Sequence, residues 1–174
     1  MDAPTLSLLI SCLSLVVATA ALTWNVVQWL LSTGRAKVTL LHGFRTHYGI
    51  YAGPVTKSGA GFDLDSLRAQ GIPGTGVVGI EVINTGRAPL SVQKVTLHSR
   101  GSSISLTPVG MMQGPALPHR IEPGENASWY VDTKEAATLN RLTRSTAKKR
   151  ATGTYMSAQT GTRKTHKTRA TLKV

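Results

Sequence analysis

The chain is poor in cysteine, aromatic residues and acidic side chains, and it carries no catalytic signature motif. One of its 174 residues is cysteine, 5% are aromatic, and 8 are acidic against 20 that are lysine or arginine. A single cysteine, Cys12, cannot form a disulfide within the chain, which excludes a disulfide-built fold. The sequence has no Walker loop, no GxGxxG after a predicted strand, no GxSxG and no HExxH. We therefore predict a non-enzymatic protein with no cofactor and no bound metal.

A long apolar segment occupies residues 6–31 and contains no charged residue. A helix rises about 1.5 Å per residue, so roughly 20 residues cross the hydrocarbon core of a bilayer. Two tryptophans lie near the C-terminal end of the segment, and indole rings favour the membrane interface. The sequence thus predicts a single transmembrane anchor in residues 1–34, with membrane-embedded side chains that include Leu6, Leu15, Val17, Trp24, Trp29 and Leu31.

The alternative is a cleaved signal peptide, because residues 18–20, Ala-Thr-Ala, have the small-x-small form of a signal-peptidase site. A signal peptide normally begins with lysine or arginine, and neither precedes this segment. Cleavage after Ala20 would also expose the sequence LTWNVVQWLL to water, at about 1.5–3 kcal/mol for each large apolar side chain. These two features favour a helix that remains in the membrane.

Basic residues flank the anchor on one side alone, because none precedes it and Arg35, Lys37 and Arg45 follow it. Positively charged flanks stay in the cytoplasm, which predicts an external N-terminus and a cytoplasmic domain. The alternative is an extracytoplasmic envelope domain, if this charge bias is overridden. Asn126 begins a glycosylation triplet, but a cytoplasmic domain would not be modified there.

Residues 35–174 are enough for one domain with a modest core. Their apolar residues alternate in short stretches separated by turn sequences, which is typical of β-strands. The clearest strand is GVVGIEVIN, and the following LSVQKVTLH needs a bulge near Gln93 or Lys94 because its apolar residues change parity. Residues 53–76 are predicted to form a loop with one helical turn that Asp63 caps. The sequence Thr-Gly-Thr at residues 160–162 is predicted to close a terminal hairpin.

A short amphipathic helix is predicted after Asp132, which forms a capping-box pattern with Glu135. Trp129 alternates with Tyr130 in a predicted strand, so Trp129 is expected in the core rather than on a ligand-binding face. The predicted fold is therefore mainly β. It consists of a single N-terminal transmembrane helix followed by an antiparallel Ig-like β-sandwich with one short helix, over residues 35–174.

One stretch resembles a known group of proteins. The sequence VVGIEVINTGRAPLSVQKVTL, followed by LPHRIEPGENASWYVD, resembles the pattern of small bacterial membrane-anchored proteins with an Ig-like β-sandwich domain of uncharacterised function. The shared features are a strand, an Asn-x-Gly turn, a second strand and the motif Leu-Pro-x-x-Ile-x-Pro-Gly-Glu, over residues 77–132. The resemblance implies the fold and transfers no catalytic residue.

Few residues are candidates for metal binding or acid–base chemistry. His42 and His47 lie five residues apart, and Asp63 or Asp65 would have to complete a metal site with them. A metal needs three or four convergent ligands, which this spacing does not indicate. We expect the histidines to be ordinary polar groups and the two aspartates to cap a helix or to face solvent.

The strongest functional signal is basic charge in the last fifth of the chain, where residues 141–174 hold ten basic and no acidic residues. The predicted contact surface consists of Arg141, Arg144, Lys148, Lys149, Arg150, Arg163, Lys164, Lys167, Arg169 and Lys173. Such a cluster can bind anionic lipid at roughly 1 kcal/mol per cation, bind the phosphates of a nucleic acid, or protect an edge strand from aggregation. Tyr155 is the only aromatic residue in this region, which disfavours stacking on single-stranded nucleic acid.

These observations predict a membrane-anchored binding or scaffold module that presents a basic surface to a protein partner or to anionic lipid. A solvated surface with lipid contact ranks first, an acidic protein partner second and nucleic acid third. The alternative function is a membrane-tethered nucleic-acid-binding protein.

Overall fold

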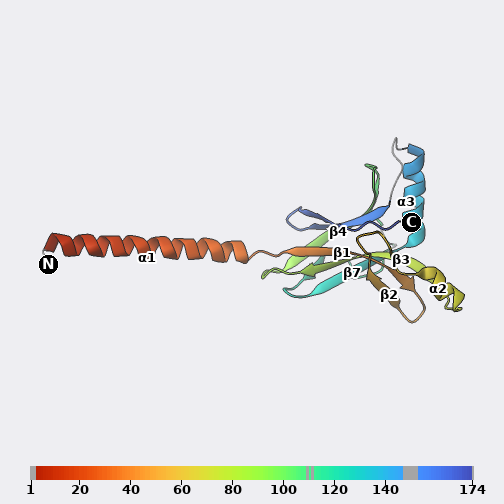
Figure 1. Cartoon of the computed structure of the whole chain (residues 1–174), viewed down its shortest axis with the longest axis horizontal. Coiled ribbons are helices and arrows are strands. Elements are labelled where there is room, and N and C mark those ends of the chain that lie inside the picture. Colours follow the sequence, from red (N-terminus) through yellow and green to blue (C-terminus); the bar gives the residue numbers. More distant parts are fainter. Residues whose placement is uncertain (1–2, 109, 111, 147–152, 174) are drawn as a thin grey trace.

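The computed structural model describes residues 3–108, 110, 112–146 and 153–173. A long helix, α1 (Ala3–Leu31), projects from a β-sandwich and points away from it along the long axis of the molecule (Figure 1). The remaining elements are β1 (Ala36–Arg45), β2 (Ile50–Pro54), α2 (Leu64–Ala69), β3 (Thr75–Asn84), β4 (Leu90–Ser99), β5 (Ser105–Leu106), β6 (His119–Ile121), β7 (Asn126–Asp132), α3 (Thr133–Thr146), β8 (Thr154–Thr160) and β9 (Thr165–Lys167).

The strands form two antiparallel sheets. One sheet has the order β2-β1-β3-β7, and the other has the order β5-β4-β8-β9, with β6 pairing with β4 beyond the end of β5. These sheets, together with the N-terminal apolar helix and the short helices, confirm the mainly β fold class predicted from the sequence. The predicted bulge is also present, since the register between β4 and β8 shifts between Val92 and Lys94.

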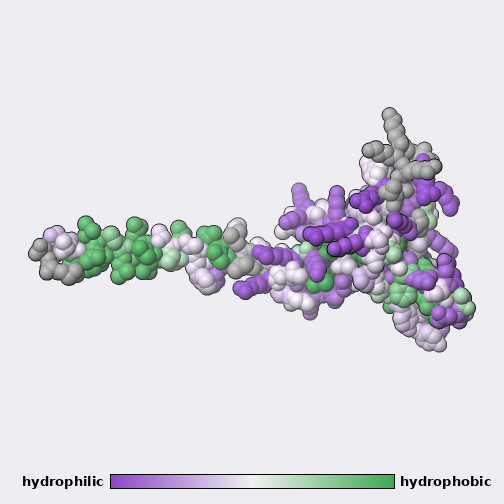
Figure 2. All heavy atoms as spheres, in the orientation of Figure 1, coloured by the Kyte–Doolittle hydropathy of each residue, from purple (hydrophilic) through white to green (hydrophobic). Residues whose placement is uncertain are grey.

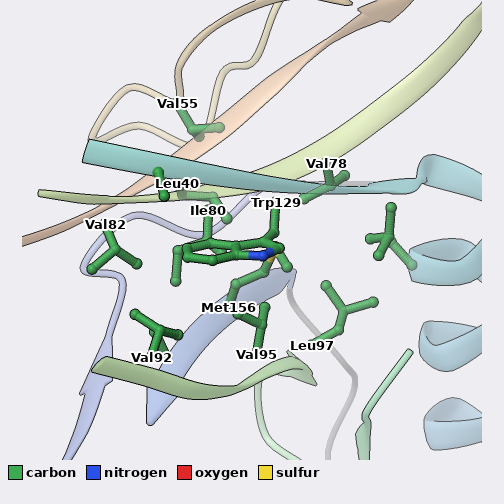
Figure 3. Close-up of a cluster of buried hydrophobic side chains, with 14 of the residues drawn as sticks. Leu40, Val55, Val78, Ile80, Val82, Val92, Val95, Leu97, Trp129 and Met156 are labelled. Atoms are coloured by element: carbon green, nitrogen blue, oxygen red, sulfur yellow. The ribbon is translucent and has the colours of Figure 1, made fainter. Parts of the chain in front are cut away.

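The core lies between the two sheets and is centred on Trp129, whose side chain is fully buried (Figure 3). Leu40 and Ile80 of the first sheet and Met156 of the second pack around it, as the alternation of each strand predicts. The indole N–H of Trp129 donates to the carbonyl of Pro115 at 2.8 Å, so the one polar atom of the ring is satisfied. The prediction that this tryptophan belongs to the core is confirmed.

A buried polar cluster fastens α3 to the second sheet. Ser99 of β4 donates to Oδ1 of Asn140 at 2.8 Å, and Asn140 Nδ2 donates to Oγ1 of Thr154 at 3.0 Å. Thr143 adds a bond from its hydroxyl to Ser99 Oγ at 3.1 Å. All four residues are buried, so the hydrogen bonds are shielded from water and define one docking position for the helix.

Two local predictions differ from the structure. Residues 53 and 54, the start of the predicted loop 53–76, belong to β2, whose sequence IYAGP lacks the apolar alternation of a strand. The capping box of α3 is also wrong, since Asp132 directs its carboxylate to Arg45, 3.1 Å away, and among the described residues it makes no bond to the first turn of α3. An ion pair at the end of β1 thus replaces the predicted cap.

The junction between α1 and the sandwich is held by the turn that follows β3. Asn84 is fully buried, and its Oδ1 accepts from the backbone N–H groups of Arg35 at 3.3 Å and Gly86 at 3.0 Å. Its Nδ2 donates to the carbonyls of Ala88 at 2.8 Å and Ile121 at 3.1 Å. The Asn-Thr-Gly turn is therefore a structural clamp on the linker between the helix and the domain.

Candidate functional site: two cationic grooves

Strand β1 is covered on one side over only half of its length. β3 pairs with all of β1, whereas β2 pairs only with residues 41–45. The carbonyl of Leu40 accepts from Val55 N–H on the side away from β3, and backbone groups alternate in direction along a strand. By this alternation the amide and carbonyl groups of Ala36 and Val38 also point away from β3. In the described part of the chain no strand pairs with them there.

A groove of about 670 Å³ follows this open edge, and we term it the edge groove. It is lined by the uncovered half of β1 and by the edge strand β9, and its apolar lining residues include Val38, Leu40, Val55 and Ala170. Because side chains from both faces of β1 line it, the groove runs along the strand edge rather than over one face of the sheet. The edge groove therefore combines backbone N–H and carbonyl groups that no described strand pairs with and a partly apolar lining.

The charges that line the edge groove have one sign. Four exposed cations surround it: Lys37, Lys57, Lys167 and Arg169. No acidic side chain is among its lining residues, and among the described residues none of these four cations lies within 4.0 Å of a carboxylate. The positive charge is thus not neutralised within the described structure. An anionic ligand is the complement of this lining.

A second groove, of about 700 Å³, adjoins the first where the chain leaves α1, and we term it the linker groove. It lies between residues 33–36 of the linker, residues 89–91 at the start of β4, and residues 160–162 with Lys164 in the β8–β9 hairpin. Arg35 and Lys164 bring positive charge from two opposite segments, and none of the described residues that line the groove is acidic. Both grooves share Ala36 and His166.

His166 is the titratable group between the two grooves. Partial burial lowers its pKa below 6.5, and the positive charge of Lys164 lowers it further. The imidazole is therefore neutral at pH 7 and gains a proton only in more acidic solution. Acidification would add positive charge to both grooves.

The basic residues predicted from the last fifth of the chain do not form one surface. Arg141 and Arg144 lie exposed on α3, at the end of the domain away from α1 (Figure 1). Lys164 lines the linker groove, and Lys167 and Arg169 line the edge groove. The other members are placed as follows: Arg163 lies in the β8–β9 turn, Lys173 lies next to Gly59, and Lys148, Lys149 and Arg150 lie outside the described residues.

Sequence reasoning missed three cations of the grooves as contact residues. In the sequence, Arg35 and Lys37 indicate only the orientation of the anchor, and Lys57 lies in a region predicted as loop. A signal for Lys37 was present in the strand pattern, because it alternates with the core residues Val38 and Leu40. The position of Lys57 depends on the short strand β2, which the sequence did not indicate.

The residues predicted as membrane-embedded all belong to α1. α1 is long and apolar enough to cross a membrane over Ala3–Trp29, and none of this stretch is buried against the domain. Figure 2 shows the contrast between this hydrophobic helix and the largely hydrophilic sandwich. The side chains of Leu6, Leu15, Val17, Trp24 and Trp29 are exposed, and Leu31 is the last residue of the helix.

The candidate metal ligands have separate structural roles. His42 is buried and accepts from the backbone N–H of Phe62 through Nδ1 at 2.9 Å, while His47 lies against the ring of Tyr48. Asp63 caps α2 by accepting from two backbone N–H groups, as predicted, and Asp65 pairs with Arg68 at 3.2 Å. Within the described residues, no group of three or more potential ligands converges.

An aromatic hollow of about 280 Å³ lies at the far end of the domain, beside β2 and α2. Its lining includes the exposed side chains of Tyr48, Tyr51, Phe62 and Ile72, and it contains no charged residue. The hollow is separate from the two cationic grooves, with which it shares no lining residue.

Comparison with protein families, with curated proteins and with solved structures finds no significant match to this chain.

Proposed function

We propose that this chain is a single-pass membrane protein whose domain binds an extended acidic segment of a partner protein in the edge groove. The function is binding or scaffolding rather than catalysis. α1 spans the membrane, the N-terminus lies outside, and the sandwich faces the cytoplasm. The length and exposure of α1 support the anchor, and the cations Arg35 and Lys37 directly after it support the orientation. The two antiparallel sheets around one buried tryptophan support an Ig-like relationship.

The observation that carries the proposal is the open edge of β1 within a cationic lining. An extended peptide can add to such an edge as a further strand, with main-chain hydrogen bonds for affinity and side-chain contacts for specificity. Apolar side chains on one face of the peptide would contact the half-buried Val38 and Ala170. Acidic side chains on the other face would meet the surrounding lysines and Arg169.

Membrane anchoring strengthens this mode of binding. The part of β1 that β2 leaves unpaired is about five residues long, and a peptide that pairs with so short a segment forms few hydrogen bonds. A partner in the same membrane is held at high effective concentration, so a weak groove is sufficient for capture. We therefore propose a scaffold that binds other membrane components rather than a high-affinity receptor for soluble proteins.

The test uses the full chain in nanodiscs of phosphatidylcholine, which carry no net charge. The probe is a fluorescent peptide of alternating valine and glutamate, compared with the same peptide carrying N-methyl groups on alternate amides. Binding is measured by fluorescence anisotropy. We expect the parent peptide to bind and N-methylation to weaken binding at least tenfold, because it removes the donors that pair with β1. Equal binding of the two peptides would contradict strand addition.

A pair of charge-matched variants tests the groove itself. Lys37→Gln with Lys57→Gln removes two cations from the edge groove, and Arg141→Gln with Arg144→Gln removes two from α3. Exposed ion pairs contribute about 0.2–1 kcal/mol each, so the first variant should weaken peptide binding by about twofold to thirtyfold. The second should leave it unchanged. If a single-stranded oligonucleotide competes with the peptide and binds more tightly, the nucleic-acid alternative replaces this proposal.

Orientation is tested separately with a protease-sensitive tag after residue 174. A cytoplasmic domain predicts that the tag is protected in intact cells and cleaved after lysis. Cleavage in intact cells would place the domain outside and would support the envelope alternative.

A further inference from the structure

We propose that the linker groove binds the phosphate headgroup of an anionic phospholipid from the membrane that α1 spans. This inference rests on the membrane-spanning role proposed for α1, and it concerns a different groove from the one assigned to the protein partner. Bound lipid would hold the domain against the bilayer surface.

The linker groove lies close to the end of α1. α1 ends at Leu31 and β1 begins at Ala36, so four residues lie between them. An extended chain spans at most about 3.3–3.6 Å per residue, which places the start of the linker groove within about 14 Å of the helix end. The headgroup layer is roughly 5–8 Å thick on each side of the hydrocarbon core. The groove therefore lies on the side of the same leaflet, within reach of its headgroups.

Backbone hydrogen bonds and close packing fix the walls of the linker groove. The backbone of Arg35 is held on both sides, since its N–H donates to Asn84 and its carbonyl accepts from the N–H of Thr85 at 2.8 Å. Gly86 packs so closely on residues 33–35 that a Cβ atom at this position would overlap the linker backbone. On the opposite wall, the N–H of Gly161 donates to the carbonyl of Ser91 at 2.8 Å. Both walls thus have fixed positions.

The side chains that line the linker groove match a phosphate group. Arg35 and Lys164 place a cation on each wall, and the hydroxyl groups of Ser91 and Thr162 also line the groove. The buried hydroxyl of Thr160 donates to the carbonyl of Lys164 at 3.1 Å, so it holds the hairpin rather than a ligand. Cations and hydroxyl donors are the groups that bind phosphate oxygens. The absence of acidic side chains from the lining distinguishes this groove from an ordinary mixed-charge surface. Its wide, open form suits a headgroup that remains attached to its acyl chains.

The experiment measures which lipids stay bound to the full chain. The protein is reconstituted in nanodiscs containing phosphatidylcholine and phosphatidylglycerol, and native mass spectrometry records the lipids retained after release. We expect the wild-type chain to retain phosphatidylglycerol in preference. Arg35→Gln with Lys164→Gln should lower this preference about thirtyfold, because each cation at an anionic leaflet contributes roughly fivefold. Far-ultraviolet circular dichroism confirms that the variant is folded.

Two controls assign the result to this groove. The α3 variant Arg141→Gln with Arg144→Gln loses the same charge and should keep the preference; an equal loss would show general electrostatic attraction and overturn the proposal. Inorganic phosphate at matched ionic strength should displace little lipid, and full displacement would show a site for free phosphate instead. Lack of any preference in the wild-type chain would also overturn it.

The same samples separate this inference from the proposed function. The edge-groove variant Lys37→Gln with Lys57→Gln should retain phosphatidylglycerol while losing peptide binding. The linker-groove variant should show the reverse pattern. Failure of lipid retention with intact peptide binding therefore rejects the lipid site alone.

Discussion

Asn84→Ala tests whether the clamp between the helix and the domain stabilises the fold. The side chain makes four hydrogen bonds, to Arg35, Gly86, Ala88 and Ile121, and it is fully buried. A hydrogen bond contributes about 0.5–1.5 kcal/mol net, and a buried group left without a partner costs about 1–3 kcal/mol. Ile121 is buried and cannot reach water easily, whereas Arg35 is exposed and can. We expect the free energy of unfolding to fall by about 2–4 kcal/mol.

Differential scanning calorimetry of the full chain in detergent micelles provides the measurement. For a domain of this size, a loss of 1 kcal/mol lowers Tm by about 2–6 °C, so the variant should unfold roughly 10 °C lower. The matched control is Asn126→Ala, which removes one bond of an exposed amide to Glu81. Its Tm should change by less than about 3 °C. Equal effects of the two substitutions would refute the conclusion that Asn84 organises the junction.

Three further predictions use the same calorimetric measurement. Gly86→Ala should destabilise the domain by about 1–3 kcal/mol through overlap with the linker backbone, whereas Gly53→Ala, whose new Cβ would meet only one side-chain atom at 3.9 Å, should be neutral. Burial lowers the pKa of His42 in the folded state. The contribution of this residue to the free energy of unfolding is therefore fully present above pH 6.5 and is lost as the pH drops from 6.5 through the folded-state pKa. His42→Asn keeps an acceptor for Phe62 but does not titrate, and it should reduce this pH dependence by up to about 1.4 kcal/mol per pH unit; an unchanged slope would contradict the assignment. Asn140→Ala should cost about 2–3 kcal/mol by breaking the buried cluster under α3, and a change below 0.5 kcal/mol would show that the cluster adds little.

Much of the fold could be predicted from sequence because its signals are local. The parity change in LSVQKVTLH requires a bulge, and the register shifts between Val92 and Lys94. The burial of Trp129 followed from strict alternation in ASWYVD, and the cap at Asp63 from its place before a short helical turn. β2 was missed since only tertiary pairing with β1 makes its glycine- and proline-containing sequence extended.

Only part of the candidate site could be predicted from the sequence, because the grooves depend on how the strands pair and on which strand edges stay unpaired. Lys164, Lys167 and Arg169 were identified from the basic character of the last fifth of the chain. Their separation from Arg141 and Arg144 arises because α3 packs at the opposite end of the domain from the β8–β9 turn. No local pattern indicates this separation, nor that β2 leaves half of β1 uncovered. The grooves are therefore products of topology rather than of a motif.

The pairing of β4 with β8 affects how fast the domain can fold. Ser99 pairs with Thr154 and Val92 with Thr160, so more than fifty residues separate the partners in the sequence. Long-range pairings of this kind form slowly, because the chain loses the entropy of closing a large loop before stabilising contacts form. β-Sandwiches typically fold in milliseconds to seconds. Until then, β4 exposes an unpaired edge. If α1 inserts into the membrane before the domain folds, the unpaired edge is exposed at the bilayer surface during this time. The proteins with which it could then misassemble are other proteins of the same membrane.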